Sequence, residues 1–217
     1  GEAPSLGIHE SQSRFWENFI GRSKEFINLI LKDIEKAQPS INKYNLEEIY
    51  TYLNLVKPSL IRTEADEITY HLHILIRFEI EKELIEGKIK VKDLPRIWND
   101  KYKKYLSIEV PNDKEGVLQD IHWCQGYIGY FPTYSMGTAL SAMCKHKLEK
   151  DIGNLRELAK SKEGIEKIKK WLKENIHQYG STYTFRDLVK NVFNEEFTPA
   201  YLLEYLNNKY GKIFKLN

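Results

Sequence analysis

Apolar residues recur every three or four positions along most of this chain, and almost no segment alternates apolar and polar residues. At 100° per residue, such spacing places the apolar side chains on one face of an α-helix. Asn45 and Glu48 form a capping-box pattern at one expected helix start, and Asp93 precedes another. The pattern predicts helices over residues 10–37, 46–57, 64–87, 94–106, 116–123, 132–150, 154–160, 163–179, 185–193 and 198–210.

Residues that interrupt helices are scarce, with 12 glycines and 7 prolines among 217 residues. This scarcity favours long helices over a series of hairpins. Residues 88–91 are a candidate for a short strand. We therefore predict an all-α, multi-helix fold with at most a very short β element, organised as a single helical unit over residues 1–217.

Composition narrows the class of protein further. The 33 basic and 31 acidic residues nearly cancel, which argues against a nucleic-acid partner bound through phosphates. Two cysteines, Cys124 and Cys144, exclude a disulfide-dense scaffold and favour a reducing compartment. The sequence contains no run of about 18 apolar residues, so it predicts no membrane span. The 41% of hydrophobic residues is enough for a buried core.

Polar side chains form a stripe along one face of the helix expected after Thr63. Asp66, Thr69, Tyr70, His73 and Arg77 lie within about 60° of one direction on a helical wheel. Carboxylate, phenol, imidazole and guanidinium groups on one face are typical of a polar cleft. The same stripe is also typical of a solvated face that carries ion pairs between neighbouring turns.

Six histidines are present, but no pair has His-Glu-x-x-His spacing. His71 and His73 cannot share a helix face, so a two-histidine helical zinc site is not predicted. Glu10 stands near an expected helix start beside His9. It is a candidate carboxylate ligand for a metal, or an acidic residue that complements the helix dipole.

The segment from Gln119 to Pro132 is dense in chemically active side chains. Asp120 lies two residues before His122, which suits a carboxylate that orients an imidazole. Gly126 and Gly129 then bracket tyrosines, as in a tight loop that places a phenol accurately. An aromatic loop packed on the core has the same pattern.

Three segments together resemble one protein family. Residues 9–12 (HESQ), 61–66 (IRTEAD) and 116–123 (GVLQDIHW) are similar to the HESQ, IRxxAD and GxxQDxHW signatures of the thermostable metallocarboxypeptidases of the Taq and Pfu type, the carboxypeptidase 1 family. They occur in the order of that family. Residues 129–134 (GYFPTY) resemble its GYFPSY segment, and residues 176–206 resemble its C-terminal helices.

The resemblance implies a helical, cytoplasmic and usually homodimeric enzyme that removes C-terminal amino acids from peptides. Its metal is zinc, or cobalt in some members, held by two histidines of an HExxH helix and by the glutamate of HESQ, which corresponds to Glu10. Here nine residues precede Glu10, and the HExxH and DxRxT signatures do not occur. The segment 1–7 is typical of a loop within a longer chain. The sequence thus resembles the C-terminal portion of such an enzyme, and we expect it to be inactive alone and to hold no metal tightly.

The resemblance also suggests roles for other residues. His122 and Tyr130 are analogous to the histidine and tyrosine that stabilise the oxyanion in related helical peptidases. Arg62 is predicted to hold the terminal carboxylate of the substrate, because a guanidinium binds a carboxylate bidentately. Asp66 and His73 complete the predicted substrate-binding residues. We expect Glu10, Asp66, His73 and His122 to converge on a groove that the N-terminal portion of the enzyme covers.

Two other classes of function stay open at this point. One is a non-catalytic helical interaction module, and the other is a metal-free pseudoenzyme derived from the family. Under the enzyme hypothesis the expected partners are peptide C-termini, the N-terminal portion of the same enzyme and a second copy, with no nucleic acid and no membrane.

Overall fold

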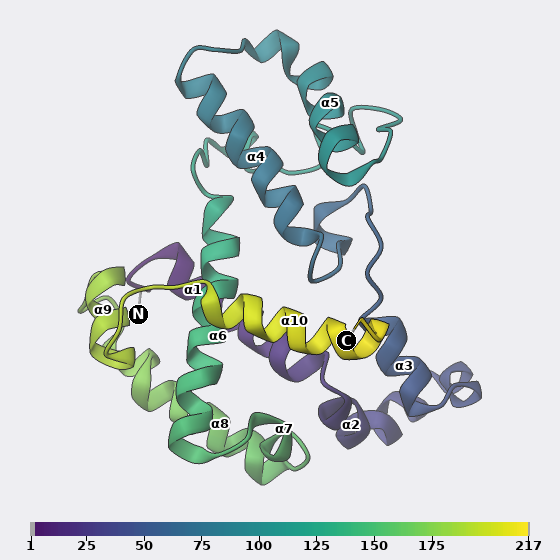
Figure 1. Cartoon of the computed structure of the whole chain (residues 1–217), viewed down its shortest axis with the longest axis vertical. Coiled ribbons are helices and arrows are strands. Elements are labelled where there is room, and N and C mark those ends of the chain that lie inside the picture. The colour runs from purple at the N-terminus through teal and green to yellow at the C-terminus, as the bar shows by residue number, and fades with distance from the viewer. Residues whose placement is uncertain (1–2, 217) are drawn as a thin grey trace. The chain divides into compact units, whose positions relative to one another are not determined.

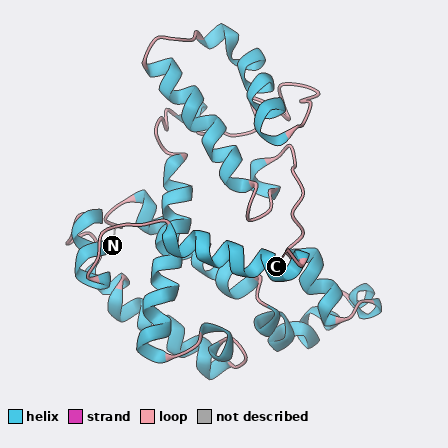
Figure 2. Cartoon of the chain, in the orientation of Figure 1, coloured by secondary structure: helices cyan, strands magenta, loops and turns pink. Residues whose placement is uncertain are grey.

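The computed structural model describes residues 3–216, which form helices joined by loops with no strand among them (Figures 1 and 2). The all-α prediction is confirmed. The α-helices are α1 (Leu6–Arg14), α2 (Lys24–Ala37), α3 (Leu46–Leu53), α4 (Tyr70–Ile85), α5 (Leu94–Leu106), α6 (Pro132–Ile152), α7 (Leu155–Leu158), α8 (Lys162–Asn175), α9 (Phe185–Phe193) and α10 (Ala200–Phe214). A π-helix spans Phe15–Gly21, and 3₁₀ turns span Pro39–Lys43, Arg62–Glu64, Val91–Asp93, Trp123–Gln125 and His177–Tyr179.

These elements gather into two compact units. The first unit comprises residues 1–54 and 136–217, and the second comprises residues 55–135. The organisation of the whole chain as one helical domain stays a prediction.

The first unit is built around α6. Leu140, Met143 and Leu148 of this helix are buried in a core that also takes side chains from α1, the π-helix, α8 and α9. Helix α10 crosses α6 in Figure 1, and the stacked rings of His146 and Tyr201, 4.1 Å apart, join the two helices. Burying this much apolar surface is the main source of stability for the unit.

In the second unit α4 and α5 lie side by side (Figure 1). Ile76 and Ile80 of α4 pack against Trp98 and Tyr102 of α5, and all four are at most 1% exposed. The rings of Trp98 and Tyr102 are stacked with centroids 5.0 Å apart. Residues 88–91 contain no strand, since Lys90 precedes a 3₁₀ turn that leads into α5.

The long helix predicted over residues 10–37 is wrong, because it is divided. After α1 the chain continues as the π-helix and then breaks at Arg22 and Ser23. Ser23 is the N-cap of α2, and its hydroxyl accepts a hydrogen bond from the N–H of Phe26. A serine at this position thus starts a new helix where the apolar spacing alone predicts continuity.

Helix α4 begins at Tyr70, later than predicted. The carboxylate of Asp66 accepts hydrogen bonds from the N–H groups of Ile68 and Thr69 and ties this segment into a turn. Asp66 and Thr69 therefore precede the helix, and the predicted stripe along it is reduced to Tyr70, His73 and Arg77. Short polar side chains compete in this way with helical hydrogen bonding.

The helix predicted over residues 116–123 is also wrong. The chain there forms turns, with the N–H groups of Gly116 and Leu118 both donating to the carbonyl of Asp113. The carbonyl of Glu115 accepts instead from the side chain of Gln119. Side-chain hydrogen bonds thus replace the helical ladder in this segment.

The predicted loop over residues 1–7 is shorter in the structure. Ser5 caps α1, which begins at Leu6, while Gly1 and Glu2 lie outside the described residues. Among residues 3–216, no helix has both the length and the apolar character required to cross a bilayer.

Candidate functional site

Glu10 lies on α1 in the first unit, beyond the first turn of that helix. Its side chain is 14% exposed, with Oε1 3.6 Å from Nδ1 of His9 and Oε2 3.4 Å from the hydroxyl of Ser13. The macrodipole acts mainly on charges in the first turn of a helix. Glu10 therefore lies too far from the start of α1 to complement the helix dipole.

Glu10 is held by a close approach between α1 and α6. A Cβ atom added at Gly137 of α6 would lie 2.8 Å from Cβ of Glu10 and 2.9 Å from the backbone nitrogen of Ser11. Only glycine allows the two backbones to come this near. Gly137 therefore sets the position of the Glu10 backbone, although sequence analysis did not single it out.

The described residues do not supply a complete metal site. Among residues 3–216, no group of three histidine, cysteine or acidic side chains is arranged to hold a metal ion. A catalytic zinc site requires about three protein ligands. Glu10 fits the role of one carboxylate ligand of such a site.

The polar centre of the second unit is Asp120, shared by two arginines. Nη2 of Arg62 donates to one carboxylate oxygen at 2.6 Å, and Nε of Arg77 donates to the other at 2.7 Å. Arg77 is fully buried and Arg62 is 6% exposed. Charge-assisted hydrogen bonds of this length are among the strongest in proteins.

Gln119 completes the connection between the 61–66 and 116–123 segments. Its side-chain oxygen accepts from the backbone N–H of Arg62 at 2.9 Å and from Nη2 of Arg77 at 2.8 Å. Its side-chain nitrogen donates to the carbonyl of Leu60 at 3.0 Å. The two segments, far apart in sequence, therefore form one network in the folded unit.

Burial and charge oppose each other in this network. Burial alone would lower the pKa of Arg62 and raise the pKa of Asp120, because it penalises both charged forms. Burial is the largest single influence on each group, but the hydrogen bonds and the charge attraction among Arg62, Arg77 and Asp120 together outweigh it. The pKa of Arg62 is therefore raised and the pKa of Asp120 is lowered. The pair is therefore ionised at neutral pH.

Asp66, a predicted substrate-binding residue, uses its carboxylate within its own loop. Besides the N–H groups of Ile68 and Thr69, it accepts from the Thr69 hydroxyl at 2.5 Å and from the N–H of Lys57 at 3.1 Å. The side chain is buried, with 8% exposed. This geometry favours a positioning role over direct contact with a peptide.

His73, the next predicted substrate-binding residue, lies in the interior with 0% of its surface exposed. Its Nδ1 is 3.0 Å from the hydroxyl of Tyr102, which itself donates to the carbonyl of Leu60. Nδ1 therefore carries the proton. Burial, followed by the charges of Arg77 and Arg62, lowers the pKa of His73 to about 3. His73 is a neutral core residue in this conformation.

His122 and Tyr130, the predicted catalytic residues, lie in one aromatic cluster. Their ring centroids are 5.2 Å apart, and Nε2 of His122 is 3.0 Å from the hydroxyl of Tyr134. Nδ1 of His122 is 3.9 Å from Asp120. The cluster therefore brings a phenol and an imidazole next to the arginine–aspartate network.

Glu81 of α4 holds the loop that carries Tyr130. Its carboxylate accepts from Nε1 of Trp123 at 2.8 Å and from the N–H of Gly129 at 3.1 Å. Burial raises its pKa, and these two hydrogen bonds oppose that rise. The sequence pattern did not single out Glu81 as a site residue. Its signal is its place four residues after Arg77, which continues the polar stripe along this helix by one turn.

The structure brings five of the six predicted site residues into one unit. Arg62 and His122 both lie next to Asp120, while Asp66 and His73 lie in the same unit as structural groups. Glu10 belongs to the first unit. The predicted groove that combines Glu10 with the others stays a prediction.

Similarity to known proteins shows the family of this chain. Residues 1–210 match the profile of the carboxypeptidase Taq (M32) metallopeptidases. The chain is 48% identical over 206 residues to thermostable carboxypeptidase 1 of Pyrococcus furiosus, covering 95% of this chain and 41% of that protein. It is 44% identical over 216 residues to carboxypeptidase 1 of Bacillus subtilis, covering 99% of this chain and 43% of that protein. The chain belongs to the carboxypeptidase Taq (M32) metallopeptidase family.

Solved structures agree in fold. The M32 carboxypeptidase from Deinococcus radiodurans superposes with a TM-score of 0.92 at 37% identity, over 99% of this chain and 44% of that one. The Pyrococcus furiosus carboxypeptidase superposes with a TM-score of 0.91 at 47% identity, over 96% of this chain and 42% of that one. The chain thus spans about two fifths of the length of these relatives.

Proposed function

We propose that this chain is the C-terminal portion of a metal-dependent carboxypeptidase that hydrolyses C-terminal amino acids from peptides. Family membership supports the reaction class. The chain matches about two fifths of the length of its relatives, which supports its assignment as one portion of a longer enzyme. In this proposal the remaining metal ligands and the general base come from the N-terminal portion. The enzyme acts as a cytoplasmic homodimer.

The observation that carries the proposal is the buried charge around Asp120. Arg62 and Arg77 both bind this one carboxylate, so the three groups together carry one positive charge. Water is largely excluded there, which strengthens the attraction for an anion. A peptide C-terminus is a carboxylate, and we propose that Arg62 supplies the charge that attracts it.

The aromatic cluster supports a role in stabilising developing negative charge. His122 lies beside Asp120 and against the ring of Tyr130, and Glu81 holds the loop that carries Tyr130. Donors held rigidly at the place where charge develops are the main source of such stabilisation. We propose that both donate hydrogen bonds to the carbonyl oxygen of the scissile bond.

Glu10 is proposed as a ligand of a divalent metal, zinc or cobalt, in the complete enzyme. Its partial burial and its fixed backbone suit a ligand that is held before the metal arrives. When bound, the metal would polarise the scissile carbonyl and activate a water molecule. Asp66 and His73 are proposed to act by positioning, through the loop before α4 and through Tyr102.

The test compares Glu10→Gln with wild type in the full-length enzyme that contains this chain. Gln keeps the shape and removes the anionic donor, so bound metal and hydrolysis of a blocked dipeptide should both fall sharply. Glu163→Gln on the exposed start of α8 is the matched control and should keep both. Full metal content and normal turnover in Glu10→Gln would contradict the assignment of Glu10. A wild-type enzyme that does not release C-terminal residues with added metal would favour a non-catalytic module or a pseudoenzyme.

A further inference from the structure

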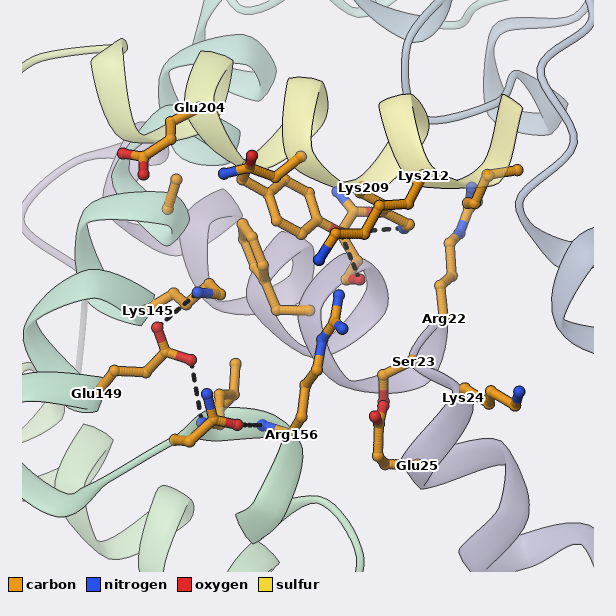
Figure 3. Close-up of a pocket in the computed structure, with 18 of the residues that line it drawn as sticks. Arg22, Ser23, Lys24, Glu25, Lys145, Glu149, Arg156, Glu204, Lys209 and Lys212 are labelled. Atoms are coloured by element: carbon orange, nitrogen blue, oxygen red, sulfur yellow. Dashed lines mark hydrogen bonds and ion pairs between the residues drawn. The ribbon is translucent and has the colours of Figure 1, made fainter. Parts of the chain in front are cut away.

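The first unit contains a second polar feature, a pocket of about 520 Å³. It is formed by the π-helix and the start of α2 on one side, by the end of α6 with α7 on another, and by α10 (Figure 3). All of its lining residues belong to the first unit. Pockets that bind small molecules typically have volumes of about 300–1,000 Å³.

Basic side chains outnumber acidic ones around this pocket. Two of its four acidic groups are neutralised, because Glu47 pairs with Lys24 and Glu149 pairs with Lys145. The basic lining residues are Arg22, Lys24, Lys145, Arg156, Lys209 and Lys212, and the acidic ones are Glu25, Glu47, Glu149 and Glu204.

Within the described residues, two of these cations have no partner for their charge. The side chains of Arg156 and Lys212 make no ion pair or hydrogen bond with any residue from 3 to 216. Figure 3 shows both pointing into the centre of the pocket, from opposite walls. Lys209, 5% exposed, adds a third positively charged side chain, and its ammonium group lies 3.0 Å from the hydroxyl of Tyr205. Like charges that face the same space repel one another, so an anion between them would be favourable.

Asn18 provides an independent sign of a ligand. It lines the same pocket, is 1% exposed and lies in the π-helix. Neither its amide nitrogen nor its amide oxygen has a hydrogen-bond partner within residues 3–216. Buried amides are almost always paired, and π-helical turns are frequent at functional sites. Rotation of this amide toward the pocket would let a ligand oxygen accept from its N–H group.

We propose that this pocket binds a small multivalent oxyanion, with Arg156 and Lys212 as the charged anchors and Asn18 as a buried donor. A guanidinium offers a planar pair of N–H groups, and an ammonium offers a compact charge. Phosphate and polycarboxylate groups share the chemistry that these side chains recognise.

Calorimetric titration of the 217-residue chain, at constant ionic strength, tests the proposal. Sodium pyrophosphate and sodium citrate are the two probes, and saturable binding of one molecule is expected for at least one of them. Binding of pyrophosphate alone would identify a phosphate ligand, and binding of citrate alone a polycarboxylate ligand. Absence of saturable binding with both probes would overturn the proposal.

The double variant Arg156→Gln, Lys212→Gln should weaken binding of the anion about tenfold or more, because it removes at least one charge-assisted hydrogen bond. The matched control is Lys167→Gln, Lys190→Gln, which removes the same charge from exposed positions on α8 and α9. Its affinity should stay within about twofold of wild type. An equal loss in both double variants would show attraction by net charge only, and would overturn the site.

Asn18→Asp probes the buried donor. It preserves the shape of the side chain and places a negative charge against the anion, so binding should be lost. Circular dichroism establishes whether this variant folds. If it does not fold, the comparison of the two double variants decides alone. A folded Asn18→Asp chain with wild-type affinity would exclude Asn18 from the site.

Discussion

Gly137 on α6 lies directly against Glu10 on α1, so that a single added methyl group would meet the Cβ of Glu10 at 2.8 Å. Real Cβ atoms essentially never show contacts this short. The proposed metal ligand is therefore placed by a residue that has no side chain and lies far away in the sequence. Its position depends on the packing of two helices as much as on its own helix.

Gly137→Ala should displace α1 from α6. We expect a loss of about 1–3 kcal/mol in the free energy of unfolding, the usual cost of overpacking. In the full-length enzyme it should also lower metal content, because Glu10 moves. Gly7→Ala is the matched control, since the added atom there meets its neighbours at 3.7 Å or more. Denaturant unfolding and metal analysis measure both effects, and a Gly137→Ala protein as stable as Gly7→Ala would contradict the argument.

Tyr130→Phe in the full-length enzyme should lower kcat by roughly 10²–10³, the typical loss for one oxyanion donor. KM should change little, because the hydrogen bond forms mainly in the transition state. Tyr127→Phe removes a phenol from the same loop at an exposed position and should have no effect. Steady-state kinetics on a blocked dipeptide distinguish these outcomes. An unchanged kcat would leave Tyr130 as a packed aromatic residue.

Asp120→Asn should destabilise the second unit strongly. Two buried guanidinium groups would lose their common anion, and breaking such a buried pair costs about 3–5 kcal/mol. Asp100→Asn breaks an exposed pair with Arg96 and should cost at most about 1 kcal/mol. Urea unfolding of the two variants provides the comparison. Equal stabilities would mean that the Asp120 network contributes no more than a surface ion pair.

His73 should make the stability of the chain depend on pH. Its folded pKa is about 3, below the ordinary value of 6.5, so between these values the unfolded chain binds the extra proton. Stability is therefore complete above pH 6.5 and falls with decreasing pH, by up to about 1.4 kcal/mol per unit. His73→Asn should remove this contribution. Unfolding measured at several pH values tests it, and identical slopes in both proteins would exclude His73 as the cause.

The 217-residue chain alone should bind zinc weakly and should not hydrolyse peptides. No arrangement of three ligands exists within residues 3–216, and a single carboxylate is a poor site. Calorimetric titration with zinc measures this directly, with Glu10→Gln as the comparison. Stoichiometric binding with a submicromolar dissociation constant, or carboxypeptidase activity of the purified chain, would contradict the proposed division of the enzyme.

Local sequence determined most of the helices of this protein. The apolar spacing over residues 185–193 predicts α9 at its observed bounds, and the capping box of Asn45 and Glu48 marks the start of α3 as predicted. Both signals act within one or two turns of the chain. They depend on hydrogen bonds and side-chain faces that a short segment already contains.

The tertiary structure decided what the polar residues do. Asp66 and His73 look like site residues on a helical wheel, yet burial turns them into a loop cap and a neutral core group. Arg77, Glu81 and Gly137 gain their roles only from partners more than 40 residues away. Segment spacing carries no information about such partners, because long-range contacts form only when the whole chain buries its apolar faces together.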